Sequence, residues 1–300
     1  MRLLVVTQKV DRKDPILGFF HRWIEEFAKR YKFVTVVCLE MGEYHLPANV
    51  KVLSLGKEEG KSRFKYILRF FKYIWQERKN YDAVFVHMNQ EYVLLGWKFW
   101  KLWHKKIFLW RNHAKGNWMT KLAVLFSNKV FCTSPSSYVA KFKKTIIMPI
   151  GIDTDFFKPD PSVIRKTGSV LFLGRIAPVK KVLEFVDWLK AENFETATIV
   201  GSALPKDLWY EKKVHERVWR NGLNSKVKFV AAVAQEEARK LYQSHETYVN
   251  FTPAGSMDKT IIEAAACGAK LHVRNPDLRE FRVESHSLHA LFSDLERALS

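Results

Sequence analysis

Short apolar runs alternate with helical patterns along this chain, and this alternation is the feature that most constrains its fold. Residues 3–7 read Leu-Leu-Val-Val-Thr, a continuous apolar run that is typical of a strand buried on both faces. Residues 18–31 follow with Phe20, Trp23 and Ile24 at helical spacing. Because strands that alternate with helices form parallel sheets covered on both faces, the chain is predicted to belong to the α/β class.

The alternation occurs twice, on either side of a segment rich in proline and glycine. In the first half we expect strands over residues 3–7, 33–39, 50–55, 83–87, 107–110, 129–133 and 146–148, and helices over 18–31, 62–79 and 92–105. In the second half we expect strands over 169–173, 196–201, 226–231, 247–251 and 270–273, and helices over 180–192, 207–221, 235–243, 259–267 and 288–299. The connection falls in residues 149–167. The pattern predicts two Rossmann-like domains with parallel sheets facing a central cleft, at residues 1–158 and 159–300.

The charge balance is strongly basic, with 50 Lys and Arg against 31 Asp and Glu and a formal net charge of +19. This excess predicts attraction to an anionic partner, such as nucleic acid, an anionic membrane or a phosphorylated substrate. The three cysteines lie in apolar runs, which indicates buried reduced thiols and excludes a disulfide framework. A cytoplasmic location fits such thiols. No signal peptide is visible, and no apolar run approaches the roughly 18 residues that a membrane span needs.

Several common site motifs are absent from the sequence. The chain has neither the dinucleotide-binding pattern GxGxxG after a strand nor the phosphate-binding loop GxxxxGK[ST], which disfavours a nicotinamide enzyme and a P-loop NTPase. It also lacks CxxC, HExxH and GxSxG, so neither a zinc site nor a serine hydrolase is predicted. We expect no metal and no bound cofactor.

Two stretches of the second half carry groups that suit an anionic ligand. Gly174-Arg175 directly follows an expected strand, and Lys180 lies at the start of the next expected helix. Ligands of open α/β sheets bind outside the carboxyl ends of the strands, and an arginine and a lysine beside a helix N-terminus can clamp a pyrophosphate. The alternative is that both side chains simply lie on a surface loop.

The second stretch is a loop of small residues followed by a helix that ends at Gly268. Backbone N–H groups at the start of this helix suit an anion. Glu263 lies one turn inside the helix, where its carboxylate could accept hydrogen bonds from a ribose diol. Asp258 would repel phosphates, so it is expected either to cap the helix or to face sugar hydroxyls, with Lys259 offsetting its charge.

These motifs together resemble glycosyltransferase family 4. The second-half match consists of Gly174-Arg175 with Lys180, followed about eighty residues later by Gly-Ser-x-Asp-Lys-x-x-x-Glu-Ala-x-Ala-x-Gly from Gly255 onward. The remaining matching segments are residues 7–9 with Gly18, the strand 81–87 that ends at a histidine, Trp110-Arg111-Asn112-His113, and Pro149-Ile150-Gly151-Ile152-Asp153 with Phe156. The resemblance covers residues 1 to about 275.

The resemblance implies the GT-B fold and transfer of a hexose, with retention and without a metal, from a nucleotide-diphosphate sugar. The donor would bind to the second domain and the acceptor to the first. Arg175 and Lys180 would stabilise charge on the leaving nucleotide, and His113 would lie near the anomeric centre. The resemblance assigns catalytic roles to His113, Arg175 and Lys180, donor binding to Gly18, Gly174, Gly255, Ser256, Asp258, Lys259, Thr260 and Glu263, and an acceptor-side place to His87.

The chain departs from the family at two positions. The family often has a second glutamate where this chain has Gly255, and two adjacent glycines where it has Gly18-Phe19. These departures leave the identity of the sugar open. The remaining alternatives in the same fold are an inverting transferase and a phosphorylase.

Two expected helices, residues 62–79 and 92–105, interleave basic and aromatic residues. Such helices can lie in a membrane interface, bind single-stranded nucleic acid, or simply bury their aromatics and solvate their lysines. The predicted partners are a nucleotide sugar, a glycan or lipid-linked acceptor, and an anionic membrane in peripheral contact, with no nucleic acid expected. This places the protein in the cytoplasm at the inner face of the cell membrane. The alternative of a different class is a basic module without catalysis that binds nucleic acid or an anionic membrane.

Overall fold

The computed structural model describes residues 1–60, 62–254, 258–278 and 280–299, and the chain divides into two compact units. Unit 1 consists of Met1–Met148 together with the end of the chain from Phe292 onward, and unit 2 consists of Pro149–Leu291. The predicted domain boundary at 158/159 lies in the segment that precedes the first strand of unit 2.

Unit 1 contains a sheet of seven parallel strands in the order β3-β2-β1-β4-β5-β6-β7. The apolar run of residues 3–6 is fully buried in β1, which pairs with β2 on one side and β4 on the other. The seven strands are β1 (Arg2–Val10), β2 (Phe33–Met41), β3 (Val50–Ser54), β4 (Ala83–His87), β5 (Lys106–Trp110), β6 (Lys129–Cys132) and β7 (Thr145–Ile147).

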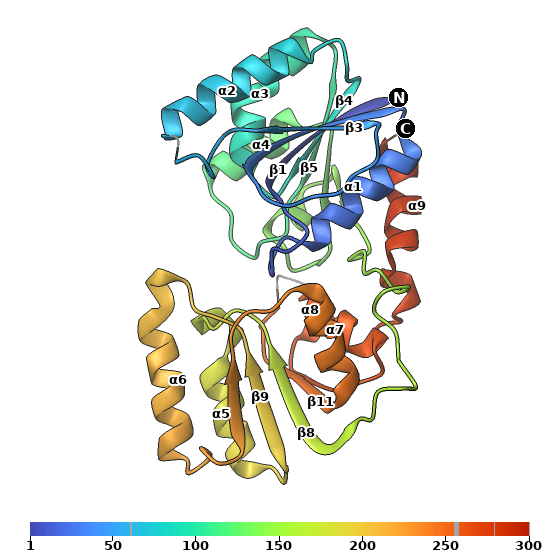
Figure 1. Ribbon diagram of the computed structural model, residues 1–300. Helices are drawn as coiled ribbons and strands as arrows, with labels where there is room; N and C mark the ends of the chain where they lie inside the picture. Colours follow the sequence, from blue (N-terminus) through green and yellow to red (C-terminus); the bar gives the residue numbers. More distant parts are fainter. Residues whose placement is uncertain (61, 255–257, 279, 300) are drawn as a thin grey trace. The chain divides into compact units, whose positions relative to one another are not determined.

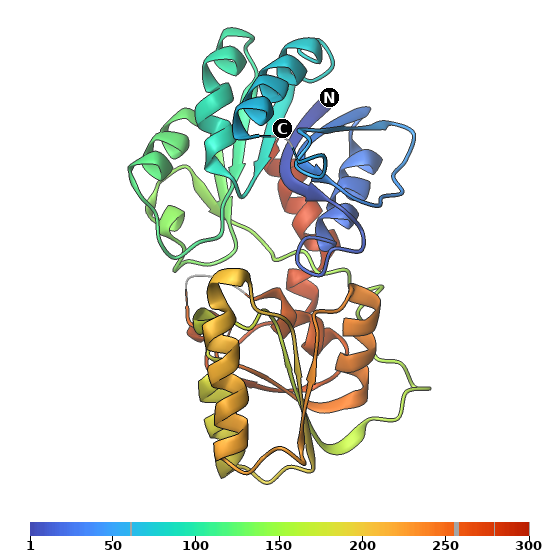
Figure 2. The same ribbon diagram turned by 60° about the vertical axis from the view of Figure 1, so that its left-hand side comes forward.

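Helices cover both faces of this sheet (Figures 1 and 2). On one face lie α2 (Arg63–Gln76), α3 (Gln90–Leu102) and α4 (Trp118–Phe126). On the other face α1 (Phe19–Arg30) packs against the end of α9 (Leu288–Leu299). Their contact includes the rings of Phe27 and Phe292, whose centroids are 4.9 Å apart.

Helix α4 was not predicted from the sequence. Asn117 caps its first turn by accepting a hydrogen bond from Thr120 N (3.1 Å), and Thr120 Oγ1 accepts one from Asn117 N (3.1 Å). This reciprocal pair satisfies two backbone donors that a helix start would otherwise leave unpaired.

Unit 2 contains a sheet of five parallel strands in the order β10-β9-β8-β11-β12. The strands are β8 (Lys166–Leu173), β9 (Thr196–Val200), β10 (Val227–Val230), β11 (His245–Asn250) and β12 (Lys270–Val273). One face is covered by α5 (Val182–Ala191) and α6 (Leu208–Arg220), and the other by α7 (Gln235–Ser244) and α8 (Lys259–Ala266). The predicted α/β class with two parallel sheets is confirmed.

The predicted helix over residues 180–192 starts later than expected. Pro178–Lys180 form a 3-10 turn, and Lys181 follows with a left-handed backbone (φ 57°) before α5 begins at Val182. Lys180 therefore lies in the turn between β8 and α5, not in the helix itself.

Candidate functional site

The carboxyl ends of β8 and β9 meet in a close backbone contact. Gly174 N donates a hydrogen bond to Val200 O (3.0 Å), and a Cβ added to Gly201 would lie 1.9 Å from Gly174 O. Gly201 also has a positive φ of 148°, so the fold requires glycine at 201. Gly174 is different, because a Cβ there would meet nothing closer than the Phe172 ring at 3.8 Å. The packing of unit 2 therefore does not require glycine at 174.

Arg175, the next residue, has a buried donor that no described residue pairs with. Its side chain is half-buried, and Nε has no hydrogen-bond partner among the residues that the structure describes. A buried donor that makes no hydrogen bond costs about 1–3 kcal/mol, so native proteins rarely keep one without a reason. An anionic oxygen bound at this edge of the sheet would satisfy Arg175.

Lys180 and Asp258, which are far apart in the sequence, form a buried ion pair. Lys180 Nζ lies 2.5 Å from Asp258 Oδ2, and only 7% of the Asp258 side chain is exposed. The same carboxylate accepts hydrogen bonds from Asn250 Nδ2 (3.0 Å), Thr252 Oγ1 (3.1 Å) and Thr260 Oγ1 (2.9 Å). The structure thus brings Lys180, Asp258 and Thr260 together at the ends of β8 and β11.

Burial of Asp258 opposes its ionisation, but the positive charge of Lys180 and the hydrogen bonds from Lys180, Asn250 and Thr260 outweigh burial. The pKa of Asp258 is therefore held well below its usual range. Asp258 is therefore ionised at neutral pH. Asp258 occupies the N-cap position of α8, but among the described residues its side chain makes no capping hydrogen bond to the backbone of that helix.

Glu263 lies in α8 with its carboxylate held from two sides. Tyr242 donates its hydroxyl to Oε2 (3.2 Å), and Lys259 Nζ lies 3.1 Å from Oε1. Burial, and then the charge of Glu263, raise the pKa of Tyr242 well above its usual range, so this hydroxyl stays protonated and donates. An ionised carboxylate offers about four lone pairs, so Glu263 keeps capacity for further donors.

Sequence reasoning missed the buried polar groups that support these residues. Tyr248 donates its hydroxyl to Thr260 Oγ1 (2.6 Å), and Asn250 bonds to both Tyr248 and Asp258. The available signal was Asn250 itself, a polar residue that ends a buried strand at the ligand edge of a parallel sheet. The predicted donor-binding residues Gly255 and Ser256 lie outside the described residues.

In unit 1, the predicted acceptor-side residue His87 is part of the core. It ends β4 and is 2% exposed, its ring stacks on Phe20 with centroids 4.0 Å apart, and Nδ1 lies 3.2 Å from Thr7 Oγ1. Burial lowers its pKa to about 3, so the imidazole is neutral at physiological pH. Its acceptor-side role stays a prediction.

This burial gives His87 a measurable effect on stability. An unfolded histidine has a pKa near 6.5, so the unfolded chain takes up a proton below that pH while folded His87 does not. The contribution of neutral His87 to the free energy of unfolding is therefore fully present above about pH 6.5 and is lost as the pH falls toward 3. Between pH 7.5 and 5, His87 should account for a loss of roughly 2 kcal/mol. Urea unfolding at both pH values tests this prediction. His87→Gln should make the difference in the free energy of unfolding between the two pH values smaller by that amount, and an unchanged difference would contradict the prediction.

The other two predicted residues of unit 1 lie in loops. His113 is exposed, and its Nδ1 lies 3.0 Å from Lys115 N and 2.9 Å from Lys115 O, so its Nε2 faces away from this contact. Gly18 precedes α1, where a Cβ would lie 2.5 Å from Asp14 O. Glycine at 18 is thus required by the local turn, whatever its role toward a ligand.

Further polar groups collect at the carboxyl ends of the strands of unit 1. Asn89, which follows β4, donates from Nδ2 to Oε1 of Gln8 near the end of β1 (2.5 Å). Among the described residues, three buried side-chain atoms in this region have no hydrogen-bond partner: Gln90 Oε1, Arg111 Nε and Thr133 Oγ1. These atoms have hydrogen-bonding capacity that the described residues leave unused, and none was predicted from the sequence.

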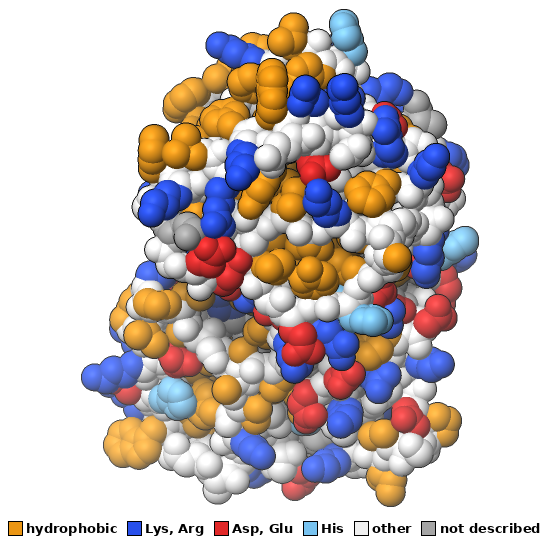
Figure 3. Space-filling model, turned by 45° about the horizontal axis from the view of Figure 1, so that its top comes forward, with side chains coloured by type: hydrophobic (Ala, Val, Ile, Leu, Met, Phe, Trp, Pro, Cys, Tyr) orange, Lys and Arg blue, Asp and Glu red, His pale blue; other side chains and the backbone are white. Residues whose placement is uncertain are grey.

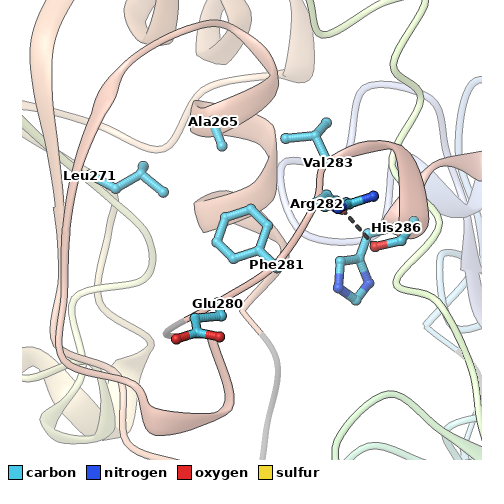
Figure 4. A pocket seen from close by; sticks show the side chains of 8 residues that line it. Ala265, Leu271, Glu280, Phe281, Arg282, Val283 and His286 are labelled. Atoms are coloured by element: carbon cyan, nitrogen blue, oxygen red, sulfur yellow. Dashed lines mark hydrogen bonds between the residues drawn. The ribbon is translucent and has the colours of Figure 1, made fainter.

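Unit 2 also has a hollow of about 820 Å³ away from the predicted site residues (Figure 4). Phe281 and Val283 lie beside α8 in this view, and Ser285 Oγ donates to Arg282 O (2.7 Å). The residues that line it are Ala265, Leu271, Glu280, Phe281, Arg282, Val283, Ser285 and His286. None of them was predicted to bind the donor.

Across the described ranges, no three or more His, Cys, Asp or Glu side chains are placed to hold a metal ion. That no metal takes part stays a prediction. Across the same ranges, no helix combines the length and apolar character needed to cross a bilayer.

No protein-family model and no curated protein matches this chain, but solved structures do. HepE from Anabaena in complex with UDP is similar over 100% of this chain and 91% of that chain, with a TM-score of 0.71 and 19% identity. Sucrose-phosphate synthase from Thermosynechococcus elongatus is similar over 100% of this chain and 90% of that chain, with a TM-score of 0.71 and 14% identity. WaaG, a glycosyltransferase involved in lipopolysaccharide biosynthesis, is similar over 99% of this chain and 91% of that chain, with a TM-score of 0.62 and 14% identity.

At these identities the likeness concerns the fold, and it confirms the predicted GT-B fold. The closer resemblance to glycosyltransferase family 4 stays a prediction.

Proposed function

We propose that this chain is a glycosyltransferase that moves a sugar from a nucleotide-diphosphate sugar to a hydroxyl of a glycan or lipid-linked acceptor. The observation that carries the proposal is the buried Nε of Arg175, which has no hydrogen-bond partner among the described residues and follows Gly174, where a Cβ would meet no close contact. Both lie at the sheet edge where α/β proteins bind ligands. Solved structures of similar fold are complexes of HepE with UDP, with UDP and glucose, and with UDP-glucose, which supports a nucleotide sugar as the ligand.

In this proposal Arg175 and Lys180 act on the diphosphate. Transfer breaks the bond between the anomeric carbon and a diphosphate oxygen, and it forms a bond from that carbon to the acceptor oxygen, whose proton is released. Negative charge grows on the departing diphosphate, and fixed cations placed there lower the barrier. Glu263 takes the ribose hydroxyls with the acceptor capacity that Tyr242 and Lys259 leave free.

The finer parts of the proposal are retention at the anomeric carbon, a hexose as the transferred sugar, independence from metals, and His113 near the reacting carbon. They rest on the resemblance of the sequence motifs to glycosyltransferase family 4. NMR of the product anomer tests retention, and activity in the presence of EDTA tests metal independence. A cytoplasmic place at the inner face of the cell membrane belongs to the same proposal.

A thermal-shift panel with UDP, GDP, ADP and their sugar conjugates tests the function. A ligand at a hundred times its Kd adds about 2.7 kcal/mol of stability, so one of these nucleotides should raise the melting temperature of the wild type. Arg175→Ala should lose that rise. If no nucleotide stabilises the wild type, the proposed donor site is wrong.

A further inference from the structure

Helix α2 presents an apolar stripe to the surface of unit 1. Phe64, Leu68 and Trp75 lie at positions that share one side of the helix, and 68%, 53% and 53% of their surfaces are exposed. On the neighbouring helix α3, Leu102 is 71% exposed. Single exposed apolar residues are ordinary, but four large ones on two adjacent helices mark an interaction surface.

Aromatic contacts join the two helices into one face. The ring centroids of Phe71 and Phe99 are 5.6 Å apart, and those of Trp75 and Trp103 are 5.7 Å apart. Both pairs are edge-to-face. These aromatic rings therefore pack against one another and hold the two helices side by side beneath the apolar stripe.

The charge around this face is positive. Exposed lysines lie on both helices and just beyond the end of α2, and α2 contains no Asp or Glu between Arg63 and Gln76. Of the nearby acidic residues, Glu59 pairs with Arg69 (2.9 Å), and Glu77 is buried and pairs with Lys51 (2.7 Å). Glu58 accepts a hydrogen bond from Met41 N (3.2 Å), and Glu91 is exposed in the first turn of α3, so the lysines outnumber the exposed carboxylates. The lysines are Lys65, Lys72, Lys79, Lys98 and Lys101. In Figure 3 hydrophobic side chains gather in the upper left of the view with Lys and Arg side chains around them.

We infer that the α2–α3 face docks on an anionic lipid bilayer. In this arrangement Phe64, Leu68, Trp75 and Leu102 enter the headgroup region, and the lysines lie against lipid phosphates. Amphipathic helices that combine a large apolar stripe with Lys and Arg bind membrane surfaces in this way, through buried apolar area together with attraction to anionic lipid. The inference rests on unit 1 alone: it names the surface for the membrane contact included in the proposed function, and it does not depend on sugar transfer.

Two other occupants fit the same face less well. A second copy using this face would bring two sets of lysines together, and like charges in contact disfavour such a pairing. Single-stranded nucleic acid stacks its bases on aromatic faces, whereas this stripe contains Leu68 and Leu102, and one face of the Trp75 ring lies against the Arg78 guanidinium, 4.6 Å from its centroid. An anionic bilayer complements both sets of residues, because its acyl chains accept the leucines and its phosphates attract the lysines.

Flotation of the full chain with lipid vesicles tests the inference. One set of vesicles is phosphatidylcholine, and the other contains about one third phosphatidylglycerol, which gives the surface potential that attracts basic residues. We expect binding to the anionic vesicles at low salt, at least tenfold weaker binding to neutral vesicles, and weaker binding at about 0.5 M salt. Equal binding to both vesicles, or none to the anionic ones, would overturn the inference.

Matched variants locate the surface. Phe64→Ser with Leu68→Ser should weaken binding to anionic vesicles at least tenfold, since each side chain contributes apolar burial. Trp209→Ser with Trp219→Ser is the control, because these residues are similarly exposed on α6, which also carries basic residues. An equal loss in the control, or no loss in the α2 variant, would refute the assignment.

A charge variant keeps the test decisive if the apolar variant does not fold. Lys65→Gln with Lys72→Gln changes only exposed side chains and should weaken binding about tenfold or more, because each cation near an anionic surface contributes about fivefold. The salt dependence should also become shallower. Unchanged affinity in this variant, or wild-type binding to a single-stranded oligonucleotide that exceeds its binding to anionic vesicles, would overturn the inference.

Discussion

Arg175→Ala is expected to lower kcat/KM for sugar transfer by about 10²–10³-fold and to leave the free energy of unfolding unchanged or slightly higher. The two effects separate because Arg175 Nε is buried without a hydrogen-bond partner among the described residues. Removing such a group relieves an unsatisfied donor instead of breaking a contact. A side chain whose removal costs no stability but lowers turnover is typical of a ligand contact.

Turnover is measured with the nucleotide sugar that stabilises the wild type, and stability by urea unfolding. The control is Arg217→Ala, which removes an arginine of the same unit from an exposed ion pair with Asp187 (2.5 Å). Exposed pairs contribute at most about 1 kcal/mol, and Arg217 lies on α6, so turnover should stay at the wild-type level. Near-wild-type turnover in Arg175→Ala would remove this residue from the proposed site, even if a nucleotide still bound.

The sheets could be predicted from the sequence because their strands are buried on both faces. Continuous apolar runs such as residues 3–6 and 83–86 are typical of strands in a parallel sheet that is covered on both faces, and the structure buries both runs fully. The apolar spacing of α1 was equally clear, since Phe20, Trp23 and Phe27 all pack inward. Here the local pattern and the tertiary environment agree.

Helix α4 could not be predicted with the same ease because its apolar residues do not form a single face. Trp118 and Leu125 are exposed while Ala123 and Val124 are buried, so the periodic signal is weak. The start of α5 was misplaced for another reason. Lys181 has a left-handed backbone conformation, which cannot be predicted from a lysine because glycine and asparagine are the usual residues in that conformation.

For the candidate site, the sequence supplied the residues but not their pairing. Arg175, Lys180 and Glu263 could be selected from their positions after strands and inside a helix. That Lys180 meets Asp258, and that Tyr242 meets Glu263, depends on the order β8-β11-β12 and on helices packing across that edge. Contacts between residues so far apart in the chain depend on the order of the strands in the sheet, which cannot be predicted from a single sequence.

Asp258→Asn is expected to lower the free energy of unfolding by about 3–5 kcal/mol, the largest stability effect we predict. The substitution keeps the shape of the side chain but removes its charge, which leaves Lys180, 21% exposed, without its counter-ion. It also turns one acceptor oxygen into a donor, and Asp258 accepts from Asn250, Thr252 and Thr260. Urea unfolding at neutral pH measures the loss, and an effect below about 1 kcal/mol would contradict a buried ion pair.

The sign of the pH dependence follows from the pKa of Asp258, which lies below the unfolded value near 3.9. The contribution of a carboxylate with a lowered pKa is fully present above the unfolded value and is lost as the pH falls through the folded one. The stability difference between wild type and Asp258→Asn should therefore stay constant from pH 8 to about 5 and shrink below pH 4. A difference that changed between pH 8 and 6 would point to another group.

The double variant Lys180→Met with Asp258→Asn separates the structural role of this pair from its proposed role in transfer. Lys180→Met alone leaves the buried Asp258 carboxylate without its counter-ion, so it should lower the free energy of unfolding by about as much as Asp258→Asn does. With both charges gone, neither is left unpaired, and the combined loss should be smaller than the sum of the single losses by about 1–3 kcal/mol. Turnover should not recover, because the diphosphate still lacks the Lys180 cation. A double variant that regained both stability and turnover would show that Lys180 serves only to hold Asp258.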